Sequence, residues 1–252
     1  MNGSPQQKIS GGPPEVDGGV PTAGFLIVDK PFGLSSARAV ARVKGIARRA
    51  GAAKRYKVGH AGTLDPAATG VLVILLGKAT KQCERLMGMP KTYTATVRLG
   101  ATTATDDAEA DPVPWPNATP PDEPTLRAAL GKFVGEFDQV PPNFSAVKVG
   151  GRRAYAAARS GESITIEPKR VRCDRLDLVR YAWPEVELEM DTGRGFYVRS
   201  LARDLGVVLD TGGHLTALRR TRVGNFRIAD AVDLETLDRD GLGPHVLGEV
   251  PA

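Results

Sequence analysis

The residues best suited to chemistry lie in one short segment, residues 59–70, with the sequence GHAGTLDPAATG. Its glycines and proline predict a tightly shaped loop, and the apolar run that follows predicts a buried strand. The segment contains Asp65, the first acidic residue after Asp29. Position alone allows Asp65 two roles, a nucleophilic carboxylate or the N-cap of a helix that has Pro66 as its first residue. His60 alone is typical of a loop hydrogen-bonding residue.

Elements that could position this segment follow from the hydrophobic pattern. Ser35 and Ser36 are good N-caps for a helix over residues 37–50, which has one apolar face and one arginine-rich face. Residues 92–99 alternate between apolar and polar side chains, as in a half-buried strand. Further strands are expected at 25–28, 70–77, 164–166 and 186–190, helices at 125–133 and 196–209, and a proline-rich connector at 111–124. The mixture lacks regular alternation of strands and helices, which predicts an α+β fold with a largely antiparallel sheet.

Composition and length limit the class of protein. The chain has 252 residues, of which 41% are hydrophobic and 25% charged, as in ordinary globular proteins. Residues 1–23 are rich in Gly, Pro, Ser and Gln and are expected to be a disordered tail, with one folded domain over 24–252. The longest apolar run, six residues, is too short to cross a membrane. The two cysteines and three histidines lack metal-binding spacing, so we expect a cytoplasmic protein without a structural metal.

Charge is distributed unevenly along the chain. Nine basic residues and no acidic ones lie between Lys30 and Leu64, whereas residues 101–138 carry eight acidic and two basic residues. Two further basic groups follow: Lys148, Arg152, Arg153 and Arg159, then Arg219, Arg220, Arg222 and Arg227. One such group is typical of a solvated helix face, but three predict a surface that binds a polyanion. We expect nucleic-acid binding that weakens as salt rises, and a mobile loop at 149–162 that becomes ordered on RNA.

Several motifs, in order along the chain, resemble those of one family. The stretch GHAGTLDPAATGVL at 59–72 resembles the signature loop of the TruB family of pseudouridine synthases. Five other stretches resemble further motifs of the family and occur in the family's order. They are GFLIVDKP at 24–31, KTY at 91–93 with LG at 99–100, QVPP at 139–142, GFYVRSLARDLG at 195–206 and LRRT at 218–221. The resemblance covers residues 24–230.

The resemblance implies roles for individual residues. Asp65 matches the catalytic aspartate, His60 the loop histidine, and Tyr93 the tyrosine that stacks on the target base. Arg199 matches the arginine that pairs with the aspartate, with Tyr197 beside it, and Leu218 matches an apolar residue of the pocket. The basic groups make Lys30, Arg152 and Arg153 candidates for RNA contact. Without the resemblance, Tyr93 is typical of a core residue, and Arg199 and Arg203 are typical of a helix surface.

The resemblance also implies an activity and a fold. The fold is that of pseudouridine synthases, a mixed sheet flanked by helices and RNA-binding loops. The activity is isomerisation of the T-loop uridine at tRNA position 55 to pseudouridine, after the base has been flipped out of the folded RNA. It implies no metal or organic cofactor, a tRNA T-arm stem-loop as partner, no obligate protein partner and a monomer. The family's usual C-terminal domain of the PUA kind is expected to be absent from a chain of this length.

Two other functions stay open. The basic groups suit a tRNA-folding chaperone that grips the T-arm and acts independently of catalysis. The same motifs occur in guide-RNA-dependent pseudouridine synthases, which need partner proteins. Activity on a bare T-arm stem-loop would exclude the guide-dependent synthase, whereas a chaperone would still refold RNA after Asp65→Asn.

Overall fold

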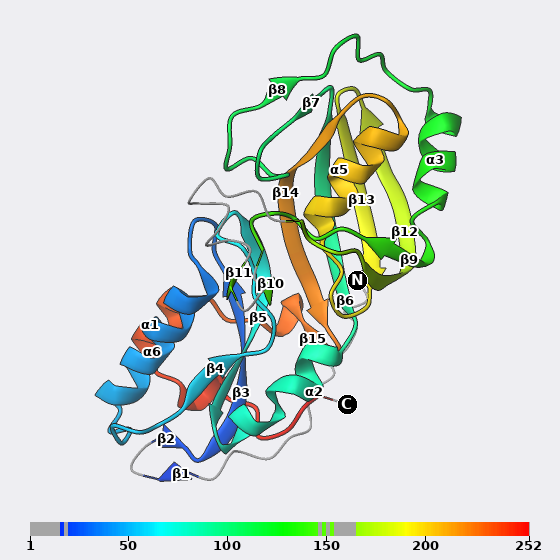
Figure 1. Cartoon of the computed structure of the whole chain (residues 1–252). Coiled ribbons are helices and arrows are strands. Elements are labelled where there is room, and N and C mark those ends of the chain that lie inside the picture. The colour runs from blue at the N-terminus through cyan, green and yellow to red at the C-terminus, as the bar shows by residue number, and fades with distance from the viewer. Residues whose placement is uncertain (1–15, 18–19, 146–147, 150–151, 154–164, 252) are drawn as a thin grey trace, which may run out of the picture. The chain divides into compact units, whose positions relative to one another are not determined.

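The computed structural model of the chain describes residues 16–17, 20–145, 148–149, 152–153 and 165–251. The chain divides into two compact units, each described here by itself (Figure 1). The first unit comprises residues 1–89 and 220–252, and the second comprises residues 90–219. No helix among the described residues is long and apolar enough to cross a membrane.

The first unit is built on two long antiparallel strands. Strand β3 (Ala23–Lys30) pairs with β5 (Ala68–Gly77) from Ala23 opposite Gly77 to Lys30 opposite Gly70. The apolar run of β5 is completely buried, as its lack of polar residues predicts. The short β4 (Val58–His60) also pairs with β5. Helix α2 (Cys83–Gly88) lies after β5 in the chain. Strand β15 (Phe226–Arg227) pairs with the end of β14 (Gly213–Val223), the strand within which the chain returns from the second unit to the first.

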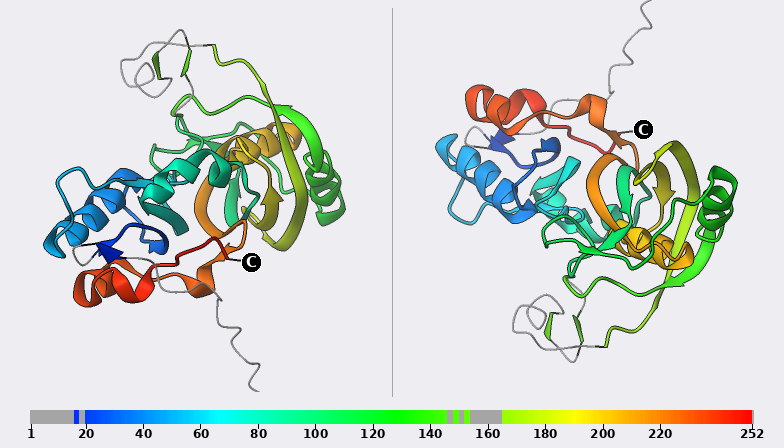
Figure 2. Two further views of the ribbon diagram at one scale, coloured as in Figure 1. Left: turned by 90° about the horizontal axis from the view of Figure 1, so that it is seen from below. Right: turned by 90° about the horizontal axis from the view of Figure 1, so that it is seen from above.

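Helices α1 (Ser36–Arg49) and α6 (Leu234–Asp240) lie side by side in this unit (Figures 1 and 2). Ser35 is the N-cap of α1, and its side chain accepts a hydrogen bond from the backbone N–H of Arg38 at 3.2 Å. The buried face of α1 carries Ala39, Val43, Ile46 and Ala47. This spacing of three and four residues confirms the prediction of a helix with one apolar face.

The second unit is a sheet covered on one side by helices. Strand β6 (Lys91–Leu99) pairs with β13 (Glu185–Thr192), β13 with β12 (Lys169–Ala182), and β12 with β9 (Gly135–Gln139), always antiparallel. Helix α3 (Glu123–Gly131) packs on β12, and α5 (Val198–Val208) packs on β6 and α3. Their apolar side chains form one core with the sheet; it includes Val97, Leu126, Leu130, Val186, Leu188, Leu201 and Leu205. The expected α+β class with a largely antiparallel sheet is confirmed.

Three expectations differ in detail from the structure. A short strand is expected at 164–166, but residues 165–168 form no strand, so the prediction is wrong for residues 165 and 166. Ile164 lies outside the described residues. The connector contains β8 (Val113–Pro114), which pairs with β7 (Ala101–Thr102). In the segment expected to be a tail, β1 (Val16–Asp17) pairs with β2 (Val20–Pro21). Alternating hydrophobicity could not identify these pairs, because two residues are too few to show a period.

Candidate functional site

Asp65 lies in a turn and not at the start of a helix. The backbone N–H of Ala68 donates to the carbonyl of Asp65 at 3.1 Å, which closes the turn before β5 begins. The interpretation of Asp65 as a helix N-cap is therefore wrong. The residue is half-buried.

The residues on either side of Asp65 are fixed by the start of α1 and the turn before it. The buried hydroxyl of Ser36 donates to the carbonyl of Leu64 and accepts from its N–H, both at 2.8 Å. The N–H of Gly33 donates to the carbonyl of Pro66 at 2.8 Å. Ser35 therefore caps the helix, while Ser36 holds the loop, a role that the sequence pattern did not reveal.

Lys30 is buried beneath the same loop. Its Nζ donates to the carbonyls of Leu34 at 2.7 Å, Pro31 at 2.9 Å and Pro66 at 3.4 Å. The side chain is completely inaccessible to solvent, so these carbonyls take up its donors and none is left for an RNA phosphate. Burial lowers the pKa of Lys30 to about 8, an effect that the nearby charge of Asp65 opposes and that of Arg220 reinforces. In this structure Lys30 shapes the loop, and its burial argues against the predicted contact with RNA.

The pKa of Lys30 gives a testable dependence of stability on pH. Its ordinary value of 10.5 applies to the unfolded chain, so between pH 8 and 10.5 the unfolded state holds a proton that the folded state has lost. The free energy of unfolding is therefore expected to rise with pH in this window, relative to the variant Lys30→Met. Urea unfolding of both proteins from pH 8 to pH 10 measures the difference. The exposed Lys57→Met variant is the control, and it is expected to follow the wild type.

Arg220 holds the loop from the other side. Its guanidinium donates to the carbonyls of Val71 at 2.7 Å, Gly62 at 3.0 Å and Thr63 at 3.3 Å, and the residue is 1% exposed. Gly70 has φ +98°, and a Cβ there would lie 2.2 Å from the Arg220 carbonyl, so only glycine fits. Arg220 therefore does not belong to the exposed basic group in which its sequence neighbours placed it.

His60 is the last residue of β4, at the entrance to the loop. Burial lowers its pKa, and the positive charge of Arg220 lowers it further, against a smaller opposing effect of a backbone hydrogen bond with Gly62. The ring is therefore neutral at physiological pH. A neutral ring suits shape or stacking in the loop and does not add to the basic charge.

Arg199 is buried in the second unit, on the first turn of α5. Its guanidinium donates to the carbonyls of Phe144 at 3.0 Å and Thr105 at 3.2 Å, and its Nε lies 3.6 Å from a carboxylate oxygen of the buried Asp107. The alternative that Arg199 is an ordinary surface residue of a helix is therefore wrong. In the sequence Asp107 is only one residue of an acidic stretch, and its pairing with Arg199 spans 92 positions.

Gln139 fixes the start of α5. Its side-chain amide donates to the carbonyl of Tyr197 at 3.1 Å and accepts from the Tyr197 N–H at 2.8 Å. Tyr197 occupies the N-cap position of α5. The buried Gln139 thus gives the QVPP motif a structural role that the sequence did not reveal.

Tyr93 and Leu218 also belong to the second unit. Tyr93 is 8% exposed, lies opposite Met190 on β13 and forms part of the core. Leu218 lies on β14 and packs against the same core with its side chain half-buried. Asp65, His60 and Lys30 thus lie in the first unit, whereas Tyr93, Tyr197, Arg199 and Leu218 lie in the second.

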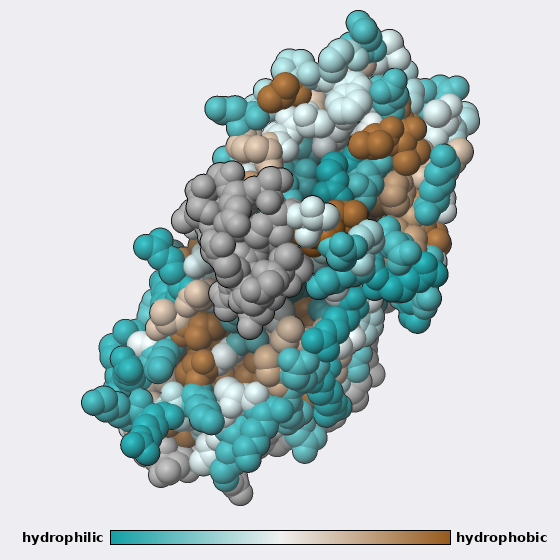
Figure 3. Space-filling model, viewed as in Figure 1, coloured by the Kyte–Doolittle hydropathy of each residue, from teal (hydrophilic) through white to brown (hydrophobic). Residues whose placement is uncertain are grey.

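The basic groups differ in how they are used. On α1, Arg42 and Arg49 both bind Asp238 of α6, at 2.5 and 2.7 Å, while Arg38 and Arg48 are exposed. Figure 3 shows hydrophilic side chains around the end of this helix. Arg152 and Arg153 form strand β11, which pairs with β10 (Lys148–Val149). Arg159 and most of the loop expected at 149–162 lie outside the described residues.

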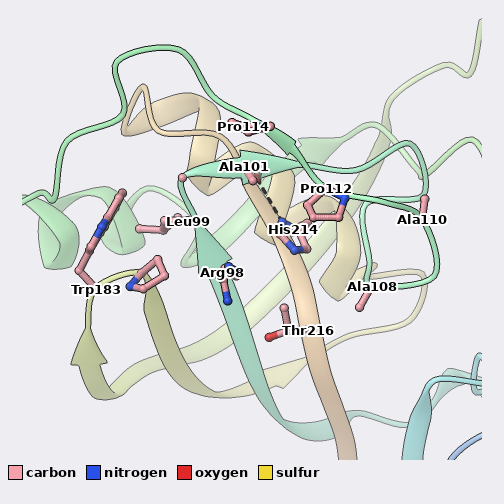
Figure 4. Close-up of a pocket in the computed structure, with 12 residues that line it drawn as sticks. Arg98, Leu99, Ala101, Ala108, Ala110, Pro112, Pro114, Trp183, His214 and Thr216 are labelled. Atoms are coloured by element: carbon pink, nitrogen blue, oxygen red, sulfur yellow. Dashed lines mark hydrogen bonds between the residues drawn. The ribbon is translucent and has the colours of Figure 1, made fainter.

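A separate pocket of about 670 Å³ lies in the second unit (Figure 4). It is lined by Arg98, Trp183 and the buried His214, whose Nδ1 lies 3.1 Å from the Ala101 carbonyl. None of the residues predicted for the site lines it. Arg98 follows Tyr93 by five positions on β6, about 17 Å along the strand. Among the described residues, no group of three or more His, Cys, Asp or Glu is placed to hold a metal ion.

Comparison with known proteins identifies the family of this chain. The sequence pattern of the TruB family pseudouridylate synthase N-terminal domain matches residues 48–198, and that of the tRNA pseudouridylate synthase B C-terminal domain matches residues 199–241. The tRNA pseudouridine synthase B of Mycobacterium sp. (strain KMS) is 45% identical over 230 residues, 90% of this chain and 75% of the relative. The enzyme of the same name from Arthrobacter sp. (strain FB24) is 48% identical over 222 residues, 85% of this chain and 70% of the relative.

Solved structures show the same fold. A chain in the crystal structure of a Cbf5-Nop10-Gar1 complex superposes with a TM-score of 0.66 at 28% identity, covering 86% of this chain and 54% of that one. This chain thus spans about half the length of that structure. A chain of an H/ACA RNP bound to a substrate RNA superposes with a TM-score of 0.63 at 24% identity, covering 89% of this chain and 58% of that chain. From the matched domains and these relatives, the chain belongs to the TruB family of pseudouridylate synthases, which are isomerases.

Proposed function

We propose that this protein converts the T-loop uridine at position 55 of tRNA to pseudouridine, with Asp65 as nucleophile. The observation that carries the proposal is the loop around Asp65, whose backbone is held by Ser36, Lys30 and Arg220. A nucleophile needs a fixed position relative to its target, and fixed geometry accounts for a large part of enzymatic rate enhancement. Asp65 is the carboxylate that this scaffold presents.

The reaction breaks the bond between N1 and the ribose C1′ and forms a bond from C5 of the same base to C1′. C5 loses a proton and N1 gains one, so the overall change is an isomerisation. In the proposal, the uridine turns out of the RNA and stacks on Tyr93, which contributes about 1–3 kcal/mol. In this proposal Arg199 pairs with the carboxylate of Asp65. In the proposal, Asp65 attacks either C6 of the base or C1′ of the ribose.

The substrate in this proposal is the T-arm stem-loop of tRNA, and the protein acts as a cytoplasmic monomer. Exposed arginines on α1, among them Arg38 and Arg48, supply charge for the phosphates. His60 helps to hold the loop open for the base. Tyr197 and Leu218 contribute to the pocket, and Arg152 and Arg153 contact the RNA backbone.

Tritium release from a T-arm stem-loop labelled at C5 of uridine tests the proposal. The purified chain is expected to release tritium without any added protein, because the reaction removes the C5 proton. A stem-loop with cytidine at position 55 is the control and is expected to release none from that position. Absence of release from both the stem-loop and full-length tRNA would overturn the proposal.

Two alternatives predict other outcomes of the same assay. Likeness to a chain from a Cbf5-Nop10-Gar1 complex favours a guide-dependent synthase, which would be inactive on the bare stem-loop. A chaperone would refold tRNA without releasing tritium, and charge reversal at Arg48, Arg49 and Arg152 would abolish that refolding. The higher identity to the tRNA pseudouridine synthase B enzymes supports the stand-alone activity.

A further inference from the structure

A second arginine of α5, Arg203, lies one helical turn after Arg199 and contacts the same two segments. Its Nη1 binds the Asp106 carboxylate at 3.0 Å, and its Nη2 donates to the Val140 carbonyl at 2.8 Å. Its Nε donates to the neighbouring Asp204 carboxylate at 2.9 Å. The guanidinium therefore joins residues that lie 34 positions apart in the sequence, and its side chain is only 25% exposed.

The first segment is strained at the residue that Arg203 binds. The backbone of Asp106 has φ +60°, a left-handed conformation that residues other than glycine rarely adopt. It lies between two partners of Arg199, the carbonyl of Thr105 and the carboxylate of Asp107. The backbone conformation of Asp106 therefore sets the direction in which Asp107 presents its carboxylate. The Asp106 carbonyl also accepts from the N–H of Leu215 at 3.0 Å, which ties the segment to β14.

The second segment is held in the same way. The Val140 carbonyl accepts from Arg203 and from the hydroxyl of Ser200, both at 2.8 Å. Four residues later, the Phe144 carbonyl accepts from Arg199 at 3.0 Å. Arg203 thus contacts both segments that supply the acceptors of the Arg199 guanidinium.

We propose that Arg203 is a positioning residue for the isomerisation: by holding Asp106 and Val140, it fixes the oxygen atoms of Asp107 and Phe144 that orient Arg199. The role rests on the proposed function of Arg199. The roles that the family resemblance implies do not cover the Arg203–Asp106 pair. Arg203 also belongs to none of the three basic groups in the sequence.

The electrostatics of the pair agree with this role. Burial raises the pKa of Asp106, and the effect exceeds the opposing ones of Arg203 and Arg199. Burial also raises the pKa of Asp204, again against Arg203. Burial thus penalises the charged form of both carboxylates, and Arg203 is the main group that opposes this penalty at Asp106 and holds its side chain in place.

Single-turnover tritium release by Arg203→Met, Asp106→Asn and the double variant tests the proposal. Asn tolerates the left-handed conformation of residue 106, so this variant removes the charge and keeps the backbone. Each single variant is expected to lower the rate constant of the chemical step by about 10- to 100-fold, as for a misplaced reacting group, with RNA affinity changed less than about twofold. Because the two residues act as one unit, the double variant is expected to be no slower than the slower single variant.

Controls separate positioning from folding and from the proposed function itself. Arg127→Met removes an arginine of α3 that pairs with Glu123 on the surface, and it is expected to leave the rate unchanged. Arg203→Lys retains one charged contact and is expected to recover part of the rate even if Arg203→Met folds poorly. Wild-type rates for Asp106→Asn and Arg203→Met, multiplicative effects in the double variant, or losses in affinity alone would overturn the proposal. An inactive wild type would instead overturn the proposed function.

Discussion

Replacement of Asp65 by Asn is expected to lower tritium release from the T-arm stem-loop by at least about 10⁴-fold, as for the loss of an essential nucleophile. Asn has nearly the same size and retains an acceptor oxygen, but its amide is neutral and cannot attack carbon. The loop is held through the backbone of Leu64 and Pro66, so the substitution leaves these contacts in place. The expected change is thus confined to the chemical step.

RNA affinity shows whether the loss is chemical. The variant is expected to bind the stem-loop as tightly as the wild type, measured by filter binding at fixed ionic strength, because affinity depends mainly on phosphate contacts. The matched control is Asp111→Asn, an exposed carboxylate in the connector, which is expected to be fully active. Turnover by Asp65→Asn at more than a few per cent of the wild-type rate would contradict the role of Asp65.

Replacement of Arg220 by Met is expected to have the second largest effect, on both stability and activity. Met fills much of the same volume but leaves the carbonyls of Gly62, Thr63 and Val71 without their donor. The bond to Val71 is buried, and an unsatisfied buried acceptor costs about 1–3 kcal/mol, so the free energy of unfolding is expected to fall by at least that amount. Since these carbonyls flank Asp65 in the chain, the rate is expected to fall by about 100-fold in the molecules that fold.

Urea unfolding and single-turnover kinetics measure the two effects separately. Arg220→Lys is expected to be nearly as damaging, because an ammonium group cannot reproduce the fork of a guanidinium toward three carbonyls. The control is Arg227→Met, an exposed arginine of the same basic group, for which we expect a change in stability within about 0.5 kcal/mol. Equal stability of Arg220→Met and Arg227→Met would contradict the buried role.

The sequence predicts those parts of this structure that depend on local pattern. The alternation of Tyr93, Ala95, Val97 and Leu99 fixes which face of β6 is buried, and the structure confirms that face. The cap at Ser35 and the face of α1 are local in the same sense. The motif around Asp65 predicts a shaped loop because glycine and proline restrict the backbone wherever they occur.

The contacts that hold the site could not be predicted in the same way, because they join residues far apart in the sequence. Nothing in the run Leu218, Arg219, Arg220 distinguishes the arginine that is buried from the one that is half-exposed. A count of charge assigns both to the surface. Lys30 was misplaced for the same reason, since its three acceptors become apparent only when the turn at 31–34 and the loop are folded together.

The bonds from Arg220 to Thr63 and Gly62 span 157 and 158 positions, which has a consequence for synthesis on the ribosome. Chains emerge from the N-terminus onward, and folding follows as segments become available. Asp65 is therefore translated early, but the loop around it can acquire the Arg220 contacts only after most of the protein has been made. A nascent chain that already carries the proposed nucleophile still lacks the residue that holds its loop, so this site is expected to become complete late in translation.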